Sequence, residues 1–248
     1  MNRYKIFDIP IDNVSMVEAL ETAKNILAKG EQRKIFTINP EILLLGRKDQ
    51  NYRKILQSVD LALPDGIGLV WLGRIFGIPF KERVTGTDFM EKLAGMAEQE
   101  DKSIFLLGGE NGASEKTTKT LKKKFPNLKI AGFLEYQNQW QNYEQIFRAD
   151  ILFVALGAPK QEIWIYDNLP KLPNIKIAVG IGGAFDFISG KIPRAPKLLR
   201  EIGLEWMWRL IMEPKKRWKR ALNAVIIFPI HFISYAKHAK FEARNPKS

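Results

Sequence analysis

Cysteine is absent from this 248-residue chain, and its two histidines, His231 and His238, both lie near the C-terminus. Without cysteine the chain can form neither disulfides nor thiolate metal sites, and a reducing compartment suits it. The first 230 residues also lack histidine, the other common ligand of catalytic zinc. We therefore expect no transition-metal catalytic centre.

Motifs that bind metal-diphosphate complexes or dinucleotides are missing as well. There is no Asp-x-Asp pair, which many sugar-nucleotide transferases place beside a metal, and no G-x-x-x-x-G-K-[ST] phosphate loop. The glycine run at residues 180–185 departs from the G-x-G-x-x-G fingerprint at its last position. These absences argue against a nicotinamide-dependent dehydrogenase. A diphosphate substrate would have to be neutralised by cationic side chains instead.

No apolar run is long enough to span a bilayer. Residues 1–14 interleave charged and apolar residues, so they do not resemble a signal peptide, and we expect a cytoplasmic location. The apolar run at residues 221–236 contains Asn223, Pro229 and His231 and is shorter than the ~20 residues that a spanning helix needs. We expect this run to lie in the membrane interface.

Positive charge is concentrated at the C-terminal end. The formal net charge is +12, and residues 191–248 hold 14 Lys/Arg against 4 Asp/Glu, so +10 belongs there and +2 to residues 1–190. Cations interleaved with tryptophan and apolar side chains are typical of segments that contact anionic membranes, at about 1 kcal/mol per cation. A basic helix packed on the core and a nucleic-acid-binding patch are the alternatives. We predict a core at residues 1–195 and a helical appendage, the tail, at 196–248.

Short apolar segments alternate with helical patterns along the core. A capping box of Ser15 and Glu18 begins a helix that extends to about Gly30. A short hairpin or a bent strand is expected at residues 4–11, and helices are expected at 88–100, at 140–148 and from Asn111 or Ser114 to about 125. The expected strands are 34–38, 61–63, 103–107, 129–133, 151–156 and 175–179. This alternation predicts an α/β, Rossmann-like, mostly parallel sheet with helices on both faces.

Two polar corners occur where strands meet helices. Asp65 follows a short apolar strand and Pro64, while Thr37 and Asn39 precede a helix that begins at Pro40. Ligands of parallel sheets bind at the carboxyl ends of the strands, so we expect these corners to face one cleft. The residues alone leave Asp65 open to two interpretations, a helix cap or a catalytic base.

Glycine turns follow three of the strands. Any one of these glycines could simply allow a tight turn. Because all three turns follow a strand in the same way, together they predict that a phosphorylated ligand binds at the N-termini of the following helices. The glycine-turn candidates are Gly108, Gly109, Gly157, Pro159, Gly182 and Gly183. The side-chain candidates for ligand binding are Gln161, Arg83, Lys160, Arg194 and the cations of the appendage. Glu162, in the first turn of a helix, and Asp186, beside a glycine turn, are interpreted as structural.

An ordered set of segments resembles one family, the WecG/TagA/CpsF glycosyltransferases. The resemblance covers about residues 3–220. The segments are Thr37-Ile38-Asn39-Pro40-Glu41, Leu63-Pro64-Asp65-Gly66, Glu82-Arg83-Val84-Thr85-Gly86-Thr87-Asp88, Leu106-Leu107-Gly108-Gly109, Ala155-Leu156-Gly157-Ala158-Pro159-Lys160-Gln161-Glu162 with Trp164-Ile165, residues 180–186, Arg194-Ala195-Pro196 and Gly203-Leu204-Glu205-Trp206. The resemblance implies an inverting, metal-independent enzyme without a cofactor. It would move a sugar, commonly N-acetylmannosamine or its uronic acid, from UDP to undecaprenyl-diphosphate-linked N-acetylglucosamine, as in wall teichoic acid synthesis.

The resemblance also implies roles for individual residues. Asp65 would be the general base, and Thr37 and Asn39 would orient the acceptor or donor sugar. The later turns with Gln161 would hold UDP, and Arg83 with the tail cations would stabilise the diphosphate. The tail is thought to close over the site in related enzymes. Arg209 matches the family pattern, whereas the two later family arginines align with Lys216 and Lys219, and Arg217 and Arg220 are shifted by one residue.

Partners follow from the same resemblance. We expect a UDP-sugar donor, a lipid-diphosphate acceptor and an anionic membrane surface on the inner face of the cell membrane, without nucleic acid. A nucleotide- or nucleic-acid-binding module without transferase activity is the alternative hypothesis. The identity of the donor sugar, the pathway and the oligomeric state stay open, including a homo-oligomer formed through the core.

Overall fold

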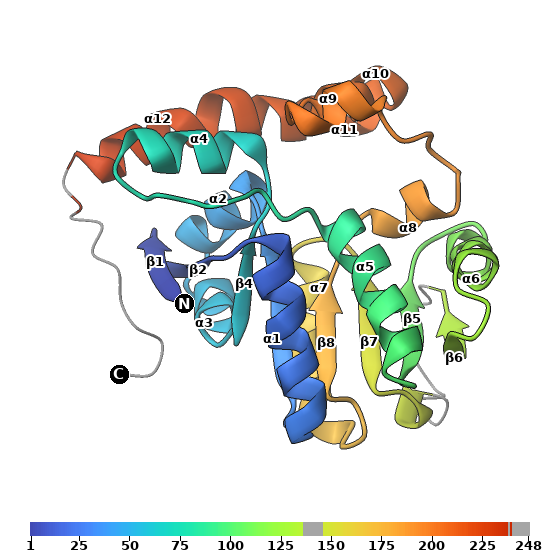
Figure 1. Cartoon of the computed structure of the whole chain (residues 1–248). Helices are drawn as coiled ribbons and strands as arrows, with labels where there is room; N and C mark the ends of the chain where they lie inside the picture. Colours follow the sequence, from blue (N-terminus) through green and yellow to red (C-terminus); the bar gives the residue numbers. More distant parts are fainter. Residues whose placement is uncertain (136–145, 238, 240–248) are drawn as a thin grey trace.

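The structure is a computed structural model that describes residues 1–135, 146–237 and 239 (Figure 1). The helix predicted at residues 140–148 falls mostly outside the described residues, and its described end is the short turn η1 (Ile146–Arg148). His238 also lies outside them.

A six-stranded parallel sheet forms the centre of the protein, in the strand order β4-β3-β8-β7-β5-β6. The strands are β3 (Arg33–Ile38), β4 (Leu61–Pro64), β5 (Ser103–Gly108), β6 (Lys129–Leu134), β7 (Ile151–Ala155) and β8 (Ile177–Gly180). The inner strands are almost entirely apolar and buried, as expected for a sheet covered on both faces. The predicted α/β fold is confirmed.

Helices cover the two faces of the sheet and enclose two separate apolar clusters. One face carries α2 (Pro40–Lys48), α3 (Gln50–Gln57) and α7 (Lys160–Asn168), which is followed by η2 (Leu169–Lys171). The other face carries α1 (Met16–Lys29), α5 (Gly86–Gln99), α6 (Ala113–Lys124) and α8 (Ala184–Ile188). The predicted capping box of Ser15 and Glu18 is present, and Gly30 ends α1 in the left-handed conformation.

A small antiparallel hairpin, β1 (Asn2–Ile6) and β2 (Ile9–Asn13), packs beside β4. The buried Asp12 carboxylate accepts hydrogen bonds from Arg3 at 2.7 and 2.8 Å and from the backbone N–H of Ala62 at 2.7 Å. The hairpin therefore holds the edge strand of the sheet, the strand that leads to Asp65.

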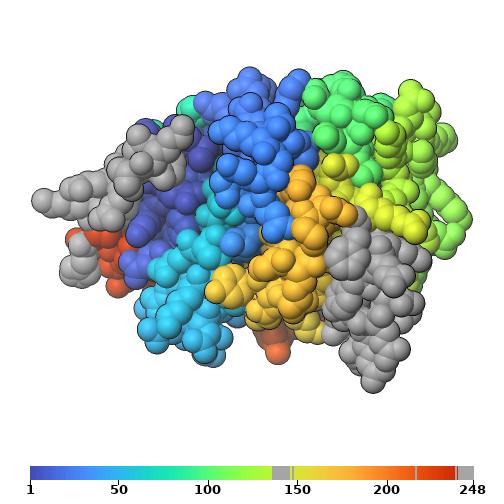
Figure 2. All heavy atoms as spheres, turned by 90° about the horizontal axis from the view of Figure 1, so that it is seen from below, coloured from blue at the N-terminus to red at the C-terminus, as the bar shows by residue number. Residues whose placement is uncertain are grey.

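The tail forms five successive helical segments that lie across the carboxyl end of the sheet, above α4 (Ile67–Ile75) (Figure 1). They are α9 (Lys197–Glu201), α10 (Glu205–Met212), α11 (Pro214–Leu222), the π-helical turn η3 (Asn223–Ile227) and α12 (Phe228–Ala236). Seen from below, the exposed face is formed mainly by the core, and only small parts of the tail are visible at its edge (Figure 2).

The two faces of the last tail helix differ. Phe228 and Phe232 are completely buried and contact aromatic rings of the core, with ring centroids 6.4 Å from Phe7 and 5.7 Å from Phe76 respectively. Ile230 on the outer face is 59% exposed. The segment therefore packs on the core through one face and keeps an apolar face outside. Among the described residues, no helix is both long and apolar enough to cross a membrane.

Candidate active site

A cavity of about 560 Å³ lies between the carboxyl ends of the strands and the tail. Its floor comes from the turns after β3, β4, β7 and β8, and its roof comes from α10, α11 and η3. The chain runs from β3 to β4 on one side and then crosses to β5 on the other, so the strand order reverses beside β3 and β8. Crevices at such reversals are where α/β sheets bind ligands.

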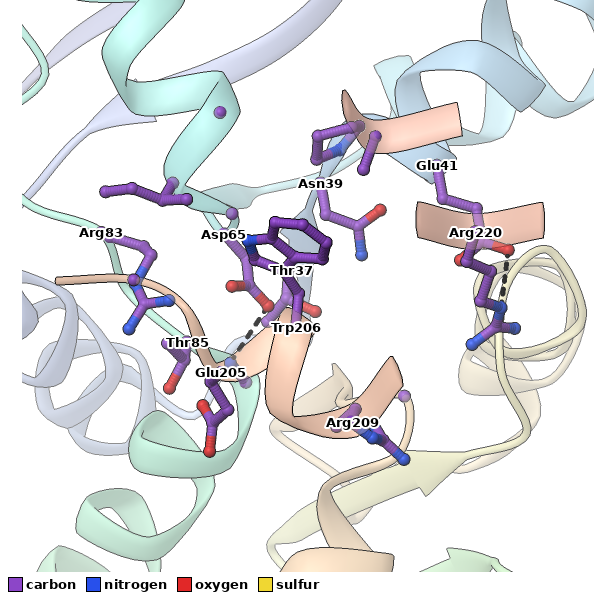
Figure 3. Close-up of a pocket in the computed structure, with 18 of the residues that line it drawn as sticks. Thr37, Asn39, Glu41, Asp65, Arg83, Thr85, Glu205, Trp206, Arg209 and Arg220 are labelled. Atoms are coloured by element: carbon purple, nitrogen blue, oxygen red, sulfur yellow. Dashed lines mark hydrogen bonds and ion pairs between the residues drawn. The ribbon is translucent and has the colours of Figure 1, made fainter. Parts of the chain in front are cut away.

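Asp65 lies at the centre of this floor (Figure 3). Its backbone N–H donates to the carbonyl of Ile38 at 2.8 Å, which fixes the corner against β3. Gly66 follows with φ +100°, and a Cβ there would lie 2.9 Å from the ring of Pro40, so glycine is required. The following helix α4 has no side-chain cap. The interpretation of Asp65 as a helix cap is therefore wrong.

The surroundings of Asp65 make it a stronger base than an ordinary aspartate. Burial raises the pKa of Asp65 to about 6, against the opposing effects of Arg83 and the backbone N–H of Gly86, and Glu205 adds to the rise. The Gly86 N–H lies 3.5 Å from Oδ2, at the limit of hydrogen-bond distance. The carboxylate is thus mostly ionised at neutral pH and poised to take a proton near that pH.

Thr37 and Asn39 reach the same cavity from the end of β3. The Thr37 hydroxyl donates to the carbonyl of Gly180 at 3.0 Å, which ties β3 to β8. The Asn39 side-chain oxygen accepts from the backbone N–H of Ile42 at 3.0 Å and caps α2. The amide nitrogen of Asn39 has no hydrogen-bond partner within the described residues, so its two N–H groups can serve a ligand.

Gln161 supports the turn after β8 rather than projecting freely into the cavity. Its Oε1 accepts from the backbone N–H of Gly182 at 2.9 Å, and its Nε2 donates to Glu162 at 2.7 Å. The second Glu162 oxygen accepts from the hydroxyl of Tyr52 on α3 at 2.9 Å. Burial raises the pKa of Glu162, while the hydrogen bonds from Gln161 and Tyr52 oppose that rise. Glu162 is therefore structural, as predicted, but through its burial rather than through the helix dipole.

Arg83 connects the core to the tail at the cavity wall. Its Nη2 donates to the carbonyl of Arg200 in α9 at 2.8 Å. Figure 3 places Arg83 on one side of Asp65, and Trp206 of α10 lies in front of Thr37 and Asp65 in that view. The tail thus supplies a large aromatic side chain to the cavity, and Arg83 helps to anchor the segment that carries it.

Arg209 packs directly on the turn after β8. A Cβ at Gly183 would lie 2.7 Å from Nη1 of Arg209, so a larger residue there would displace the guanidinium from this position. The guanidinium lies over the ring of Phe187, 4.5 Å from its centroid, and donates to Asp186 at 3.3 Å. Burial lowers the pKa of Arg209 to about 10, and nearby Arg217 contributes to the decrease. The side chain remains a cation at neutral pH.

Two further tail cations line the cavity, and both are held by carboxylates. Arg220 forms an ion pair with Glu41 of α2 at 3.0 Å, marked in Figure 3. Arg217 pairs with Glu213 one helical turn earlier at 3.2 Å. With Arg83 and Arg209, these residues place four guanidinium groups around the cavity.

The structure brings most of the predicted site residues together. Those that line the cavity are Thr37, Asn39, Asp65, Arg83, Gly157, Gln161, Gly182, Gly183, Arg209, Arg217 and Arg220. Those that do not line it are Gly108, Gly109, Pro159, Lys160, Arg194 and Lys219, and the side chain of Lys216 is outside the described part of the chain.

Physical reasons account for three of these exceptions. Gly108 and Gly109 lie against the end of β7: a Cβ at Gly108 would lie 2.5 Å from the carbonyl oxygen of Ala155, and the Gly109 N–H donates to that oxygen at 3.1 Å. Arg194 binds Asp88 and Glu205, each at 2.9 Å, so its charge is already matched by two carboxylates. Arg194 thereby holds Glu205 at the cavity edge instead of facing the cavity itself.

Several lining residues were not among the predicted site residues. They are Glu41, Thr85, Thr87, Phe187, Glu205 and Trp206. All of them except Phe187 lie in segments that resemble the family, and this resemblance was the signal available for them. Glu205 and Trp206 belong to α10 and reach the cavity only because the tail folds back over the sheet, which no local pattern encodes.

The site combines an ionisable carboxylate of raised pKa, a ring of cations and glycine turns at the carboxyl edge of a parallel sheet. This arrangement is typical of an enzyme that acts on an anionic, nucleotide-linked substrate. No group of three or more His, Cys, Asp or Glu among residues 1–135, 146–237 and 239 is arranged to hold a metal ion.

Comparison with known proteins identifies the family. A sequence model described as "Glycosyl transferase WecG/TagA/CpsF family" matches residues 4–242, so the chain belongs to this family. A Bacillus subtilis protein named N-acetylglucosaminyldiphosphoundecaprenol N-acetyl-beta-D-mannosaminyltransferase is 36% identical over 230 residues, covering 90% of this chain and 88% of the relative. Proteins of the same name from Bacillus spizizenii and Staphylococcus aureus are 35% and 27% identical, covering 93% and 94% of this chain and 88% and 91% of the relatives.

Proposed function

We propose that this protein transfers N-acetylmannosamine from UDP to the N-acetylglucosamine of an undecaprenyl-diphosphate-linked acceptor, in the synthesis of a teichoic-acid-type cell-wall polymer. The names of the relatives support both the sugar and the acceptor. The observation that carries the proposal is Asp65, a carboxylate of raised pKa at the centre of a cation-ringed cavity.

Asp65 acts as the general base in a single displacement. It takes the proton of the attacking acceptor hydroxyl while that oxygen forms a bond to the anomeric carbon of the donor. The bond from that carbon to the diphosphate oxygen breaks, its electron pair leaves with UDP, and the configuration inverts. The raised pKa supports this role because a base is most effective when its pKa lies near the working pH.

Asn39 and Thr37 orient the sugars beside Asp65. The amide nitrogen of Asn39 is the better placed donor, since the Thr37 hydroxyl already donates to Gly180. The turn at Gly182, held by Gln161, leaves glycine backbone facing the cavity at the end of β8. Exposed backbone of this kind is suited to the nucleotide diphosphate.

Cationic side chains stabilise the leaving diphosphate without a metal. Arg83, Arg209, Arg217 and Arg220 line the cavity, and each charge-assisted contact to a phosphate oxygen is stronger in a partly buried site than in water. Glu41 and Glu213 hold two of these guanidinium groups before substrate binds. Metal independence is part of the proposal and is testable with a chelator.

The protein works at the membrane as a peripheral protein. The tail joins the cation-rich α11 to an outward apolar face on α12, the combination that anionic membrane surfaces attract. A membrane location also brings the enzyme to a lipid-linked acceptor. We expect binding to anionic vesicles and no affinity for nucleic acid at physiological salt.

A transfer assay tests the proposal. The full-length protein is incubated with a panel of UDP-sugars and a lipid-diphosphate N-acetylglucosamine acceptor, and UDP release and product mass are followed with and without EDTA. We expect transfer from UDP-N-acetylmannosamine that EDTA does not reduce. Transfer only from another UDP-sugar would show that the donor is not UDP-N-acetylmannosamine. Loss of turnover in EDTA would contradict the metal-free mechanism. Binding of DNA or RNA with no transfer would favour the nucleic-acid-binding alternative.

A further inference from the structure

The cavity has a second, apolar arm that the transfer chemistry does not use. Beyond Arg217 and Arg220, its lining continues into a slot between α4 and the tail. The α4 wall is formed by Ile67, Gly68, Trp71, Leu72 and Ile75, and the tail wall by Ala221, Ala224, Val225 and Pro229. No charged side chain belongs to either set.

Each wall of the slot is one continuous helix face. On α4 the lining positions recur at four-residue steps, from Ile67 through Trp71 to Ile75. On the tail the spacing is similar, and it begins with Arg217 and ends with Pro229. The same helix face therefore changes from cationic beside the active site to apolar further away.

The shape of the slot depends on two local backbone features. Pro229 has no N–H to donate to the carbonyl of Val225 four residues earlier, and the helix widens there into the π-turn η3. On the opposite wall, Gly68 presents no side chain, and a Cβ built there would lie 3.9 Å from the Ala224 carbonyl oxygen. The two helices can thus lie close together near the active site.

The far end of the slot opens onto exposed apolar surface. Trp71 is 58% exposed and Ile75 is 73% exposed, and Val225 on the tail wall is 50% exposed. In Figure 1, α4 and the tail helices run beside each other along the same upper side of the molecule. Large apolar side chains concentrated at one mouth mark a place where an apolar partner enters.

We propose that this slot binds the polyisoprenyl chain of the lipid-linked acceptor and guides it from the bilayer to Asp65. This inference rests on the proposed function, because it assigns a path to the lipid of that acceptor. The order of features along the cavity matches the order of groups in such a molecule: a sugar hydroxyl at the carboxylate, a diphosphate near the cations, and a hydrocarbon chain beyond them. The slot thereby selects acceptors by their lipid part.

Two acceptors and two variants test the slot. Both acceptors carry N-acetylglucosamine diphosphate, one on a long polyisoprenyl chain in vesicles and the other on a short soluble alkyl chain. Val225→Trp fills the slot, and Ile230→Trp is the matched control, since Ile230 is similarly exposed on the tail but does not line the cavity. We expect Val225→Trp to lower the long-to-short ratio of kcat/KM about tenfold, with vesicle binding retained, and the control to keep the ratio. An unchanged ratio in Val225→Trp would overturn the proposal.

Photolabelling locates the polyisoprenyl chain of the acceptor without requiring turnover. A long-chain acceptor with a diazirine on its lipid is irradiated with the protein in vesicles, and labelled peptides are identified by mass spectrometry. We expect labels on α4 and η3. Labels only elsewhere, or equal labelling of the slot by a bilayer phospholipid with the same diazirine, would overturn the assignment. Slot labelling by the acceptor in a protein that transfers no sugar would support the lipid site and refute the proposed function.

Discussion

Two carboxylates follow strands of the same sheet but differ in what surrounds them. Burial raises the pKa of both Asp65 and Glu162. Both oxygens of Glu162 accept hydrogen bonds, from Tyr52 at 2.9 Å and Gln161 at 2.7 Å, and the side chain has no exposed surface. Asp65 lines the cavity, and the backbone N–H of Gly86 lies 3.5 Å from its Oδ2. Burial alone therefore does not define a catalytic base. The oxygen atoms must also be free to accept a proton from substrate.

The largest expected difference between the two carboxylates is in activity. Asp65→Asn keeps the shape of the side chain and removes the base, so we expect kcat to fall about 10³-fold, within the usual range for general-base removal. Glu162→Gln should lower kcat by no more than about tenfold, because Glu162 affects the cavity indirectly, through its hydrogen bond with Gln161. Steady-state UDP release with a lipid-linked acceptor measures both. Equal losses in the two variants would contradict the assignment of Asp65, and not Glu162, as the base.

For the stability of the fold, we expect the opposite ranking, with the larger loss on substitution of Glu162. Glu162→Leu leaves the Tyr52 hydroxyl and the Gln161 amide buried without their partner, so we expect a loss of about 2–4 kcal/mol in the free energy of unfolding. Tyr52→Phe removes one hydrogen bond to the carboxylate and should cost about 1.5–3 kcal/mol. Urea denaturation measures both changes, with Tyr166→Phe at an exposed position as the control. A Tyr52→Phe protein as stable as the control would show that the network contributes little.

The ionised carboxylate of Asp65, which the reaction requires, should destabilise the folded protein. Its pKa is raised from 3.8 to about 6, so the folded state holds the proton more tightly than the unfolded state does. The cost of ionisation is absent below about pH 4 and fully present above about pH 6. Asp65→Asn should therefore be more stable than the parent protein by roughly 1–3 kcal/mol at pH 7.5 and of equal stability near pH 4. Urea titrations at the two pH values test this, and a pH-independent difference would contradict it.

The smallest expected effects come from the charged residues that shift the pKa of Asp65. Arg83 lowers the pKa of Asp65 and Glu205 raises it. Arg83→Met should therefore move the acidic midpoint of kcat/KM to higher pH, and Glu205→Gln should move it to lower pH, each by less than about one unit. If both variants shift the midpoint in the same direction, the substitutions act by rearranging the site and not through the charges of Arg83 and Glu205.

Local sequence signals predicted most of the core. Capping at Ser15, the turns at Pro40 and Pro64 and the apolar strands all depend on neighbouring residues, and each appears in the structure. Helix α3 was missed although Asp49 caps it, because its apolar residues are few and its pattern is short. Signals that act over a few residues were therefore enough for the sheet and for the position of Asp65.

The rest of the site depends on contacts between distant parts of the chain. Tyr52 and Glu162 are 110 residues apart, and Arg194 meets Asp88 across 106 residues. Arg194 was predicted as a ligand-binding cation because it lies in a glycine- and proline-containing turn, and the sequence around it does not reveal that Asp88 pairs with it. Trp206 reaches the cavity only because the tail folds back over the sheet. Such pairings are set by tertiary packing, which no local pattern contains.

The pH dependence of kcat/KM for the parent protein and for Asp65→Asn tests the central claim most directly. With both substrates below saturation, the parent protein should lose activity about tenfold per pH unit below a midpoint near 6, the pKa of Asp65 in the free enzyme. The residual activity of Asp65→Asn should show no such midpoint. A parent profile that is flat between pH 5 and 7, or an unchanged midpoint in Asp65→Asn, would contradict the assignment of Asp65 as the base.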